Sequence, residues 1–75
     1  MRLTLLHYGP LRDHRGCVQE TMEAPVTGLG DLYRWCGFPL DPASVAVAIN
    51  DALVPWEHPL ADGDTVVFLP PVSGG

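Results

Sequence analysis

Hydrophobic and polar residues follow two different periods along this chain, and each period predicts one type of element. Residues 3–8 form an apolar-rich run that ends at Gly9-Pro10, and residues 18–22 alternate apolar and polar side chains before Pro25. Alternation with a period of two places the apolar side chains on one face of a strand. We therefore expect two strands in this part of the chain, joined as a hairpin through residues 11–16.

Apolar residues recur with a helical period in the next segment. The recurring positions, at i, i+3, i+4 and i+7, are Leu29, Leu32, Tyr33 and Cys36. Thr27 is the expected N-cap, and Gly37 is the expected end of the helix, with Pro39 just beyond it. A helix of about ten residues with Gly28 and Gly30 in its first turn is not stable alone, so its apolar stripe is expected to pack on a sheet.

The second half of the chain returns to the strand period. Residues 45–50 alternate large and small side chains, and residues 52–54 form a short return strand that Pro55 ends. Residues 65–69 form a last apolar strand, which stops at Pro70-Pro71 because proline has no N–H to donate. The order strand, strand, helix, strand, short strand, strand predicts a two-layer α+β domain.

Size and charge narrow the possible functions. A domain of 75 residues buries about 60% of the surface that its unfolded chain exposes, so a buried active site built from many residues is not expected. With 47% hydrophobic and 17% charged residues, the chain has the composition of a packed globule. The nine acidic residues outnumber the four basic ones, and the formal net charge is −5. Nucleic-acid binding is therefore excluded, and a basic protein partner is favoured.

The termini and apolar runs bear on location. No apolar run approaches the 18 residues of a membrane span, and the N-terminus begins directly with a strand-like pattern. We therefore expect a soluble cytoplasmic protein without a membrane association.

The cysteines do not suggest a disulfide framework or a metal centre. Cys17 and Cys36 are too few for the disulfides of small secreted domains, and their separation of 19 residues matches no ligand spacing. We expect both to be reduced and mostly buried, as small hydrophobic side chains are. The chain also has no glycine-rich phosphate-binding motif with a lysine. The sequence therefore predicts no metal and no cofactor bound by the chain itself.

The histidines and the acidic turn are also expected to have structural roles. His7, His14 and His58 form no ligand set by their spacing. Asp62 and Asp64 flank a glycine in a turn, where hydrogen bonding within the loop is favoured over acid–base catalysis because no base or nucleophile stands nearby.

An ordered set of motifs in the second half carries a family resemblance. The motifs are Val47-Ala48-Ile49-Asn50, Leu53-Val54, His58-Pro59-Leu60, Asp62-Gly63-Asp64 and the terminal Phe68-Leu69-Pro70-Pro71-Val72-Ser73-Gly74-Gly75. Together they resemble the C-terminal half of the small subunit of molybdopterin synthase, a family of ubiquitin-like sulfur carriers. The resemblance covers residues 45–75. The chain departs from the family pattern in two places: its helix region is shorter, and it has His7-Tyr8 where apolar aromatic residues are common in the family.

The resemblance implies a fold and a division of the chain. It implies the β-grasp fold, a mixed sheet of four to five strands packed on one main helix. Residues 1–69 would form this domain, and residues 70–75 would form a flexible tail.

The resemblance also implies that the working group is the C-terminal carboxylate of Gly75. An adenylating enzyme that uses ATP would activate it as an acyl-adenylate, and a persulfide protein would supply the sulfur of a thiocarboxylate. That thiocarboxylate would donate sulfur in molybdopterin synthesis. The acceptor is bound by a large catalytic subunit, with which the chain would form a heterotetramer. The chain would therefore not be an enzyme alone.

The residue types of the tail suit this role. Pro70 and Pro71 favour an extended backbone, so the segment through Val72 and Ser73 would project from the sheet. Gly74 and Gly75 have no side chain to obstruct a narrow channel. At about 3.3 Å per residue, the reach beyond Pro71 is on the order of 16 Å. The alternative, a frayed terminus without function, is typical of domain ends but does not explain the motif that precedes the glycines.

Two residues of the last strand are candidates for partner contact. If Val66 and Phe68 face the helix, Val67 and Leu69 face outward beside the tail. An apolar side chain in that place can anchor a partner, although a single exposed leucine is also ordinary. The family resemblance favours the partner interface.

Three other functions remain open from the sequence. The carrier could serve thiamine, cysteine or tRNA thiolation pathways, which use similar tails. A ubiquitin-like modifier joined through Gly75 to lysines begins with the same activation step. A passive binding module would not depend on Gly75 at all.

Overall fold

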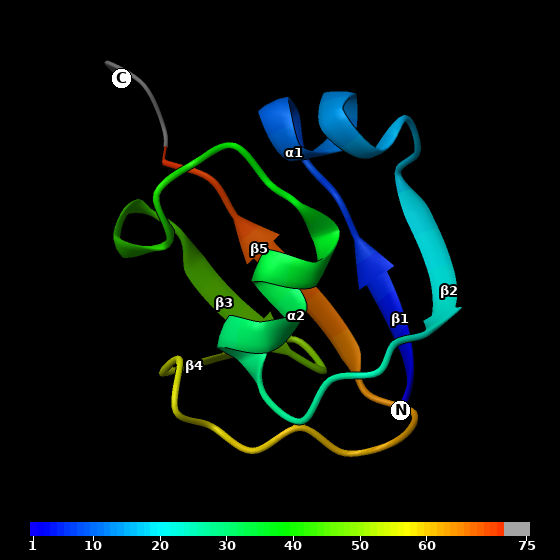
Figure 1. Cartoon of the computed structure of the whole chain (residues 1–75). Coiled ribbons are helices and arrows are strands. Elements are labelled where there is room, and N and C mark those ends of the chain that lie inside the picture. The colour runs from blue at the N-terminus through cyan, green and yellow to red at the C-terminus, as the bar shows by residue number, and fades with distance from the viewer. Residues whose placement is uncertain (72–75) are drawn as a thin grey trace.

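The computed structural model describes residues 1–71 of the chain. The elements in chain order are β1 (Arg2–Leu6), α1 (Gly9–Arg15), β2 (Gln19–Glu23), α2 (Leu29–Cys36), a short 3-10 helix (Pro42–Ser44), β3 (Ala46–Ile49), β4 (Ala52–Val54) and β5 (Thr65–Leu69). The strands form one sheet, and α2 crosses one of its faces (Figure 1). The predicted α+β class is confirmed.

The sheet has five strands in the order β2-β1-β5-β3-β4. β1 pairs antiparallel with β2 and parallel with β5, whereas β3 pairs antiparallel with both β4 and β5. The first and last strands therefore lie side by side at the centre, and the helix α2 connects one half of the sheet to the other. This mixed topology confirms the β-grasp fold that the resemblance predicts.

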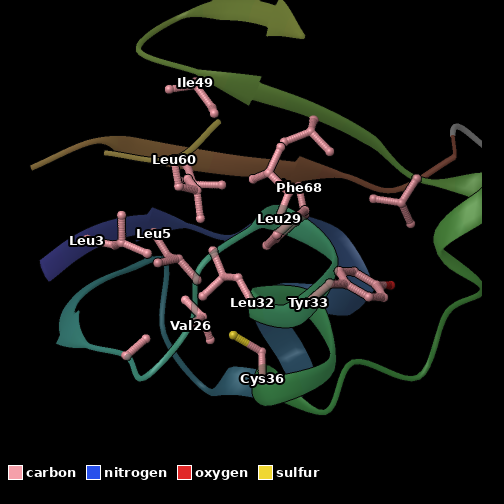
Figure 2. Packing of buried hydrophobic residues seen from close by; sticks show 14 of the residues in the cluster. Leu3, Leu5, Val26, Leu29, Leu32, Tyr33, Cys36, Ile49, Leu60 and Phe68 are labelled. Atoms are coloured by element: carbon pink, nitrogen blue, oxygen red, sulfur yellow. The ribbon is translucent and has the colours of Figure 1, made fainter. Parts of the chain in front are cut away.

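The core lies between α2 and the sheet (Figure 2). The predicted stripe is buried in full, with Leu29, Leu32, Tyr33 and Cys36 all at most 4% exposed. Val66 and Phe68 meet this stripe from β5 and are also buried, as predicted. Burial of one such aliphatic or aromatic side chain contributes about 1.5–3 kcal/mol, which stabilises a helix too short to form alone.

The ends of α2 agree with the prediction at one end only. Gly37 ends the helix in the left-handed region with a φ of 71°, and its N–H donates to Arg34, as a C-terminal glycine does. At the other end the N-cap is Gly28, not Thr27, so the predicted cap is wrong. The Thr27 hydroxyl instead donates to the Asp31 carboxylate, a side-chain contact that leaves the helix N–H groups uncapped by it.

The hairpin connection is a helix, which corrects the prediction of a loop through residues 11–16. Pro10 lies in the first turn of α1, where the missing N–H of proline costs nothing. Leu11 is fully buried, and Gly16 ends the helix with a φ of 76°. The strands are correspondingly displaced: β1 ends at Leu6 rather than at residue 8, and β2 begins one residue later than predicted.

The acidic turn before β5 acts as the sequence predicts. Asp62 Oδ1 accepts from the backbone N–H of Arg2 at 2.7 Å, and Asp64 Oδ2 accepts from that of Ala61 at 2.9 Å. Asn50, in the turn after β3, accepts from the N–H of Thr65 at 3.0 Å and donates to Asp64. These bonds fix the start of β5 and therefore its register against the neighbouring strands.

Candidate functional site

The base of the predicted tail lies at the end of the sheet where the neighbouring strands β1 and β5 both finish. Because these strands are parallel, the start of α1 comes close to the residue after β5. A Cβ on Gly9 would lie 3.6 Å from Cγ of Pro70, so the two residues are neighbours. Pro70 is half-buried and Pro71 is exposed. The other residues predicted for the tail, Val72, Ser73, Gly74 and Gly75, lie outside the described residues.

A shallow hollow of about 460 Å³ occupies the outer face of the sheet, opposite α2. Its lining is mostly apolar and comes from Leu6, Tyr8, Ala48, Asp51, Leu53, Val67 and Leu69. Val67 and Leu69 thus face outward, as their alternation with the buried residues of β5 predicts. Their role in partner contact stays a prediction.

The exposure of the hollow's apolar side chains is uneven. Val67 is only 8% exposed at its floor, whereas Tyr8 is 52% and Leu53 is 74% exposed at its rim. Apolar side chains that gather in one concave area and stay in contact with water are a common feature of protein-binding surfaces. The sequence identified Val67 and Leu69 but not Tyr8 or Leu53. Neither residue has a signal of its own in the sequence: the apolar run of residues 3–8 predicts a strand that includes Tyr8, and the short segment 52–54 does not indicate which face Leu53 takes.

The negative charge of the chain is not balanced locally by a free basic patch. Arg12, Arg15 and Arg34 each form an ion pair with a carboxylate of this chain. Three of the four basic side chains are therefore already partnered, and the remaining carboxylates dominate the surface. Such a surface favours encounter with a basic partner.

A second group of polar side chains lies at the end of the sheet beneath α1, and the sequence did not connect its members. The ring of His7 is 1% exposed, and its Nε2 donates to Glu20 Oε2 at 2.7 Å. Arg15 donates to both oxygens of Glu20, each at 2.8 Å, and the Cys17 thiol lies 3.6 Å from Oε2. Glu20, in β2, therefore accepts hydrogen bonds from three other segments: the residue after β1, the end of α1, and the turn between α1 and β2.

The pKa values of this group follow from its contacts. The hydrogen bond from Arg15 lowers the pKa of the Glu20 carboxyl to about 2, against an opposing effect of burial. Desolvation, together with the nearby Glu20 carboxylate, raises the pKa of Cys17 above the usual range of a thiol. Glu20 is therefore ionised at neutral pH, and Cys17 is a thiol rather than a reactive thiolate.

The cysteines and the other histidines take the following places. Both cysteines are free among the described residues; Cys36 is buried and Cys17 is partly buried, in agreement with the expectation that both are mostly buried. His14 and His58 are exposed and do not join His7. The group mixes histidine, cysteine and glutamate from three segments, so the spacing of like residues in the sequence does not indicate it. The spacing of Cys17 and Glu20 across a turn was its one signal in the sequence.

Within residues 1–71, none of the helices has the length and apolar character needed to cross a lipid bilayer.

Comparison with known proteins identifies the family. The sequence profile of the ThiS family matches residues 5–75. The molybdopterin synthase sulfur carrier subunit of Escherichia coli (strain K12) is 48% identical over 42 residues, which cover 56% of this chain and 51% of that protein. The chain thus spans about half the length of this curated relative.

Solved structures show the same fold. SAMP1 from Haloferax volcanii superposes with a TM-score of 0.75 at 18% identity, with 100% of both chains covered. A chain in the protein–protein complex of subunits 1 and 2 of molybdopterin-converting factor from Helicobacter pylori 26695 gives a TM-score of 0.62 at 28% identity, again with 100% of both chains covered. Because the family profile extends over nearly the whole sequence and the fold agrees, the chain belongs to the ThiS family.

Proposed function

We propose that this chain is the sulfur carrier subunit of a molybdopterin synthase, with the carboxylate of Gly75 as its working group. The observation that carries the proposal is the ThiS family match, which runs to residue 75 and so includes the terminal Pro-Pro-Val-Ser-Gly-Gly. The name of the Escherichia coli relative supports the molybdopterin pathway over the thiamine, cysteine and tRNA pathways.

The proposed chemistry begins with a carboxylate, which is a poor electrophile. An oxygen of the Gly75 carboxylate attacks the α-phosphorus of ATP on an adenylating enzyme, and pyrophosphate leaves. A persulfide sulfur of a donor protein then displaces AMP from the acyl-adenylate. A thiol cleaves the resulting S–S bond, which leaves the thiocarboxylate on Gly75 and a disulfide on the donor side. The thiocarboxylate sulfur is the nucleophile that reaches the pterin precursor.

Two parts of the fold support this use of the terminus. β5 is the central strand of the sheet and ends at Leu69, so the tail begins from a fixed point at the end of this strand. The apolar hollow, which includes Val67 and Leu69, lies directly beside this point and offers a surface for a partner. We propose that the adenylating enzyme and the large catalytic subunit both dock there, the latter in a heterotetramer. The subunit 1 and 2 complex of Helicobacter pylori supports a large-subunit partner.

Deletion of Gly75 tests the proposal in a reconstituted adenylation assay. With purified adenylating enzyme and ATP, we expect the deletion to lose at least about 99% of acyl-adenylate formation, because the reacting carboxylate is displaced by one residue of about 3.3 Å. Ser73→Ala is the matched control, since it alters the tail but keeps its length, and it should stay active. Circular dichroism should show equal folding of all three proteins. Full adenylation of the deletion variant would contradict the proposal.

Intact mass of the protein from its native cell separates the carrier from a lysine-joined modifier. A sulfur carrier gives a species heavier by the difference between sulfur and oxygen, at the C-terminal peptide. A modifier gives larger adducts in which Gly75 is joined to lysines of other proteins, since this chain contains no lysine of its own. Adducts without any thiocarboxylate would overturn the proposed function.

A further inference from the structure

The polar group beneath α1 contains three potential metal ligands from three different segments. His7 follows β1, Cys17 lies in the turn after α1, and Glu20 is in β2. One ligand atom from each lies within 4.8 Å of the other two. The geometry points to a binding site for one borderline divalent cation of the Zn²⁺ or Co²⁺ class, held by the imidazole of His7, the thiolate of Cys17 and the carboxylate of Glu20. This site departs from the expectation of no bound metal.

Two of the three distances between ligand atoms can be compared with those of a tetrahedral centre. With metal–sulfur bonds of about 2.3 Å and metal–nitrogen or metal–oxygen bonds of about 2.0 Å, a sulfur and an oxygen ligand are about 3.5 Å apart, and a nitrogen and an oxygen ligand about 3.3 Å. The Cys17 Sγ to Glu20 Oε2 distance is 3.6 Å and needs no change. The His7 Nε2 to Glu20 Oε2 distance of 2.7 Å must open by about 0.6 Å. Cys17 and Glu20 also have the two-residue spacing of paired zinc ligands.

Protons now occupy the place that the cation would take. Glu20 is ionised, so His7 Nε2–H donates to its Oε2, and the Cys17 thiol donates to the same oxygen. On binding, the Cys17 proton leaves to solvent, and the His7 proton moves to Nδ1. That nitrogen is buried and has no hydrogen-bond partner among the described residues, so the proton can move there without breaking a hydrogen bond at Nδ1. The Nε2–H bond to Glu20, which favours the present tautomer, would be replaced by the bond from Nε2 to the metal. A proton on Nδ1 would also stay unpaired, which lowers the affinity.

The surroundings permit entry and determine the charge. A surface hollow of about 350 Å³ opens beside Cys17 and is lined by Arg12, Asp13, Gly16 and Val18 as well. Arg15 would stay on Glu20 and orient it, as outer hydrogen-bond partners of metal ligands do. The thiolate and the carboxylate together balance a divalent charge. The guanidinium of Arg15 is then the one uncompensated charge, so we expect moderate rather than very tight binding.

Titration of the reduced full-length chain with Co²⁺ tests the site. Thiolate coordination to Co²⁺ gives a charge-transfer absorption in the near ultraviolet, and added Zn²⁺ should remove it. Cys17→Ser should lose this absorption, whereas Cys36→Ser, the matched control with the buried thiol, should retain it. No charge-transfer absorption in the wild type, or its persistence in Cys17→Ser, would overturn the proposal.

A second pair of variants tests the carboxylate of Glu20 and leaves the buried ring of His7 in place. Glu20→Gln keeps the shape of the side chain but exchanges a charged ligand for a neutral amide, and it should weaken Co²⁺ binding at least tenfold. Glu23→Gln, on the same strand, should bind like the wild type. Equal affinity of the two variants would place the metal elsewhere. The measurement uses no partner protein, so its outcome is independent of the proposed sulfur-carrier function.

Discussion

At the scale of single residues, the two thiols differ in chemistry because they differ in surroundings. Cys36 belongs to the apolar stripe of α2 and is 4% exposed, and burial raises its pKa to about 11. Cys17 faces a surface hollow and the carboxylate of Glu20. Cys36 therefore acts as a small hydrophobic side chain, and Cys17 is the thiol that a metal or a reagent can reach.

The raised pKa of Cys36 predicts a loss of stability at alkaline pH. The folded protein favours the neutral thiol, so its contribution is fully present below the ordinary thiol pKa of 9.0 and is lost as pH rises from there through about 11. We expect the free energy of unfolding, measured with urea, to fall more steeply over this range in the wild type than in Cys36→Ala. Burial also raises the pKa of Tyr33, but that effect is common to both proteins. Parallel pH profiles would contradict the prediction.

At the scale of elements, the strands and the helix with long regular patterns were predictable from the sequence, and the short helix α1 was not. β3, β5 and α2 follow from periods that repeat several times, and the observed β5 has the predicted bounds. α1 has seven residues with one buried side chain, Leu11, so it gives no period to detect. The pair Gly9-Pro10 is equally compatible with a strand end and a helix start. Only the packing of Leu11 against the core decides between them.

Two glycines outside the core predict opposite effects of one substitution. Gly16 ends α1 with a φ of 76°, and no described atom lies within 4 Å of an added Cβ. Gly16→Ala should therefore lower the free energy of unfolding by about 1 kcal/mol through backbone strain alone. Gly30 lies inside α2, also with open space, so Gly30→Ala should raise it by about 0.5–1 kcal/mol. Urea denaturation of both variants measures the difference, and the same sign for both would contradict this account.

At the scale of the whole molecule, a small acidic domain carries its proposed chemistry on a terminus and offers the outer sheet face for recognition. The outward direction of Val67 and Leu69 could be predicted, because it depends on strand alternation alone. The tail motif can be identified in the sequence, but its role stays a prediction. The hollow as a surface could not, since Leu6, Tyr8 and Leu53 join it only through the pairing of distant strands. The group around Glu20 was missed for the same reason.

The hollow predicts where a partner's affinity can be lost without loss of fold. Leu53 is 74% exposed on β4, so Leu53→Asp should change the free energy of unfolding by only about 0.5 kcal/mol. In the hollow, the same charge would face the partner's apolar surface, and binding to the adenylating enzyme should weaken at least tenfold, or about 1.4 kcal/mol. Val18→Asp is the matched control, because Val18 is 61% exposed but does not line the apolar hollow on the outer face of the sheet. Calorimetric titration of both variants measures the contrast. Equal affinities would place the partner on another face, whereas a loss confined to Leu53→Asp locates docking beside the base of the tail.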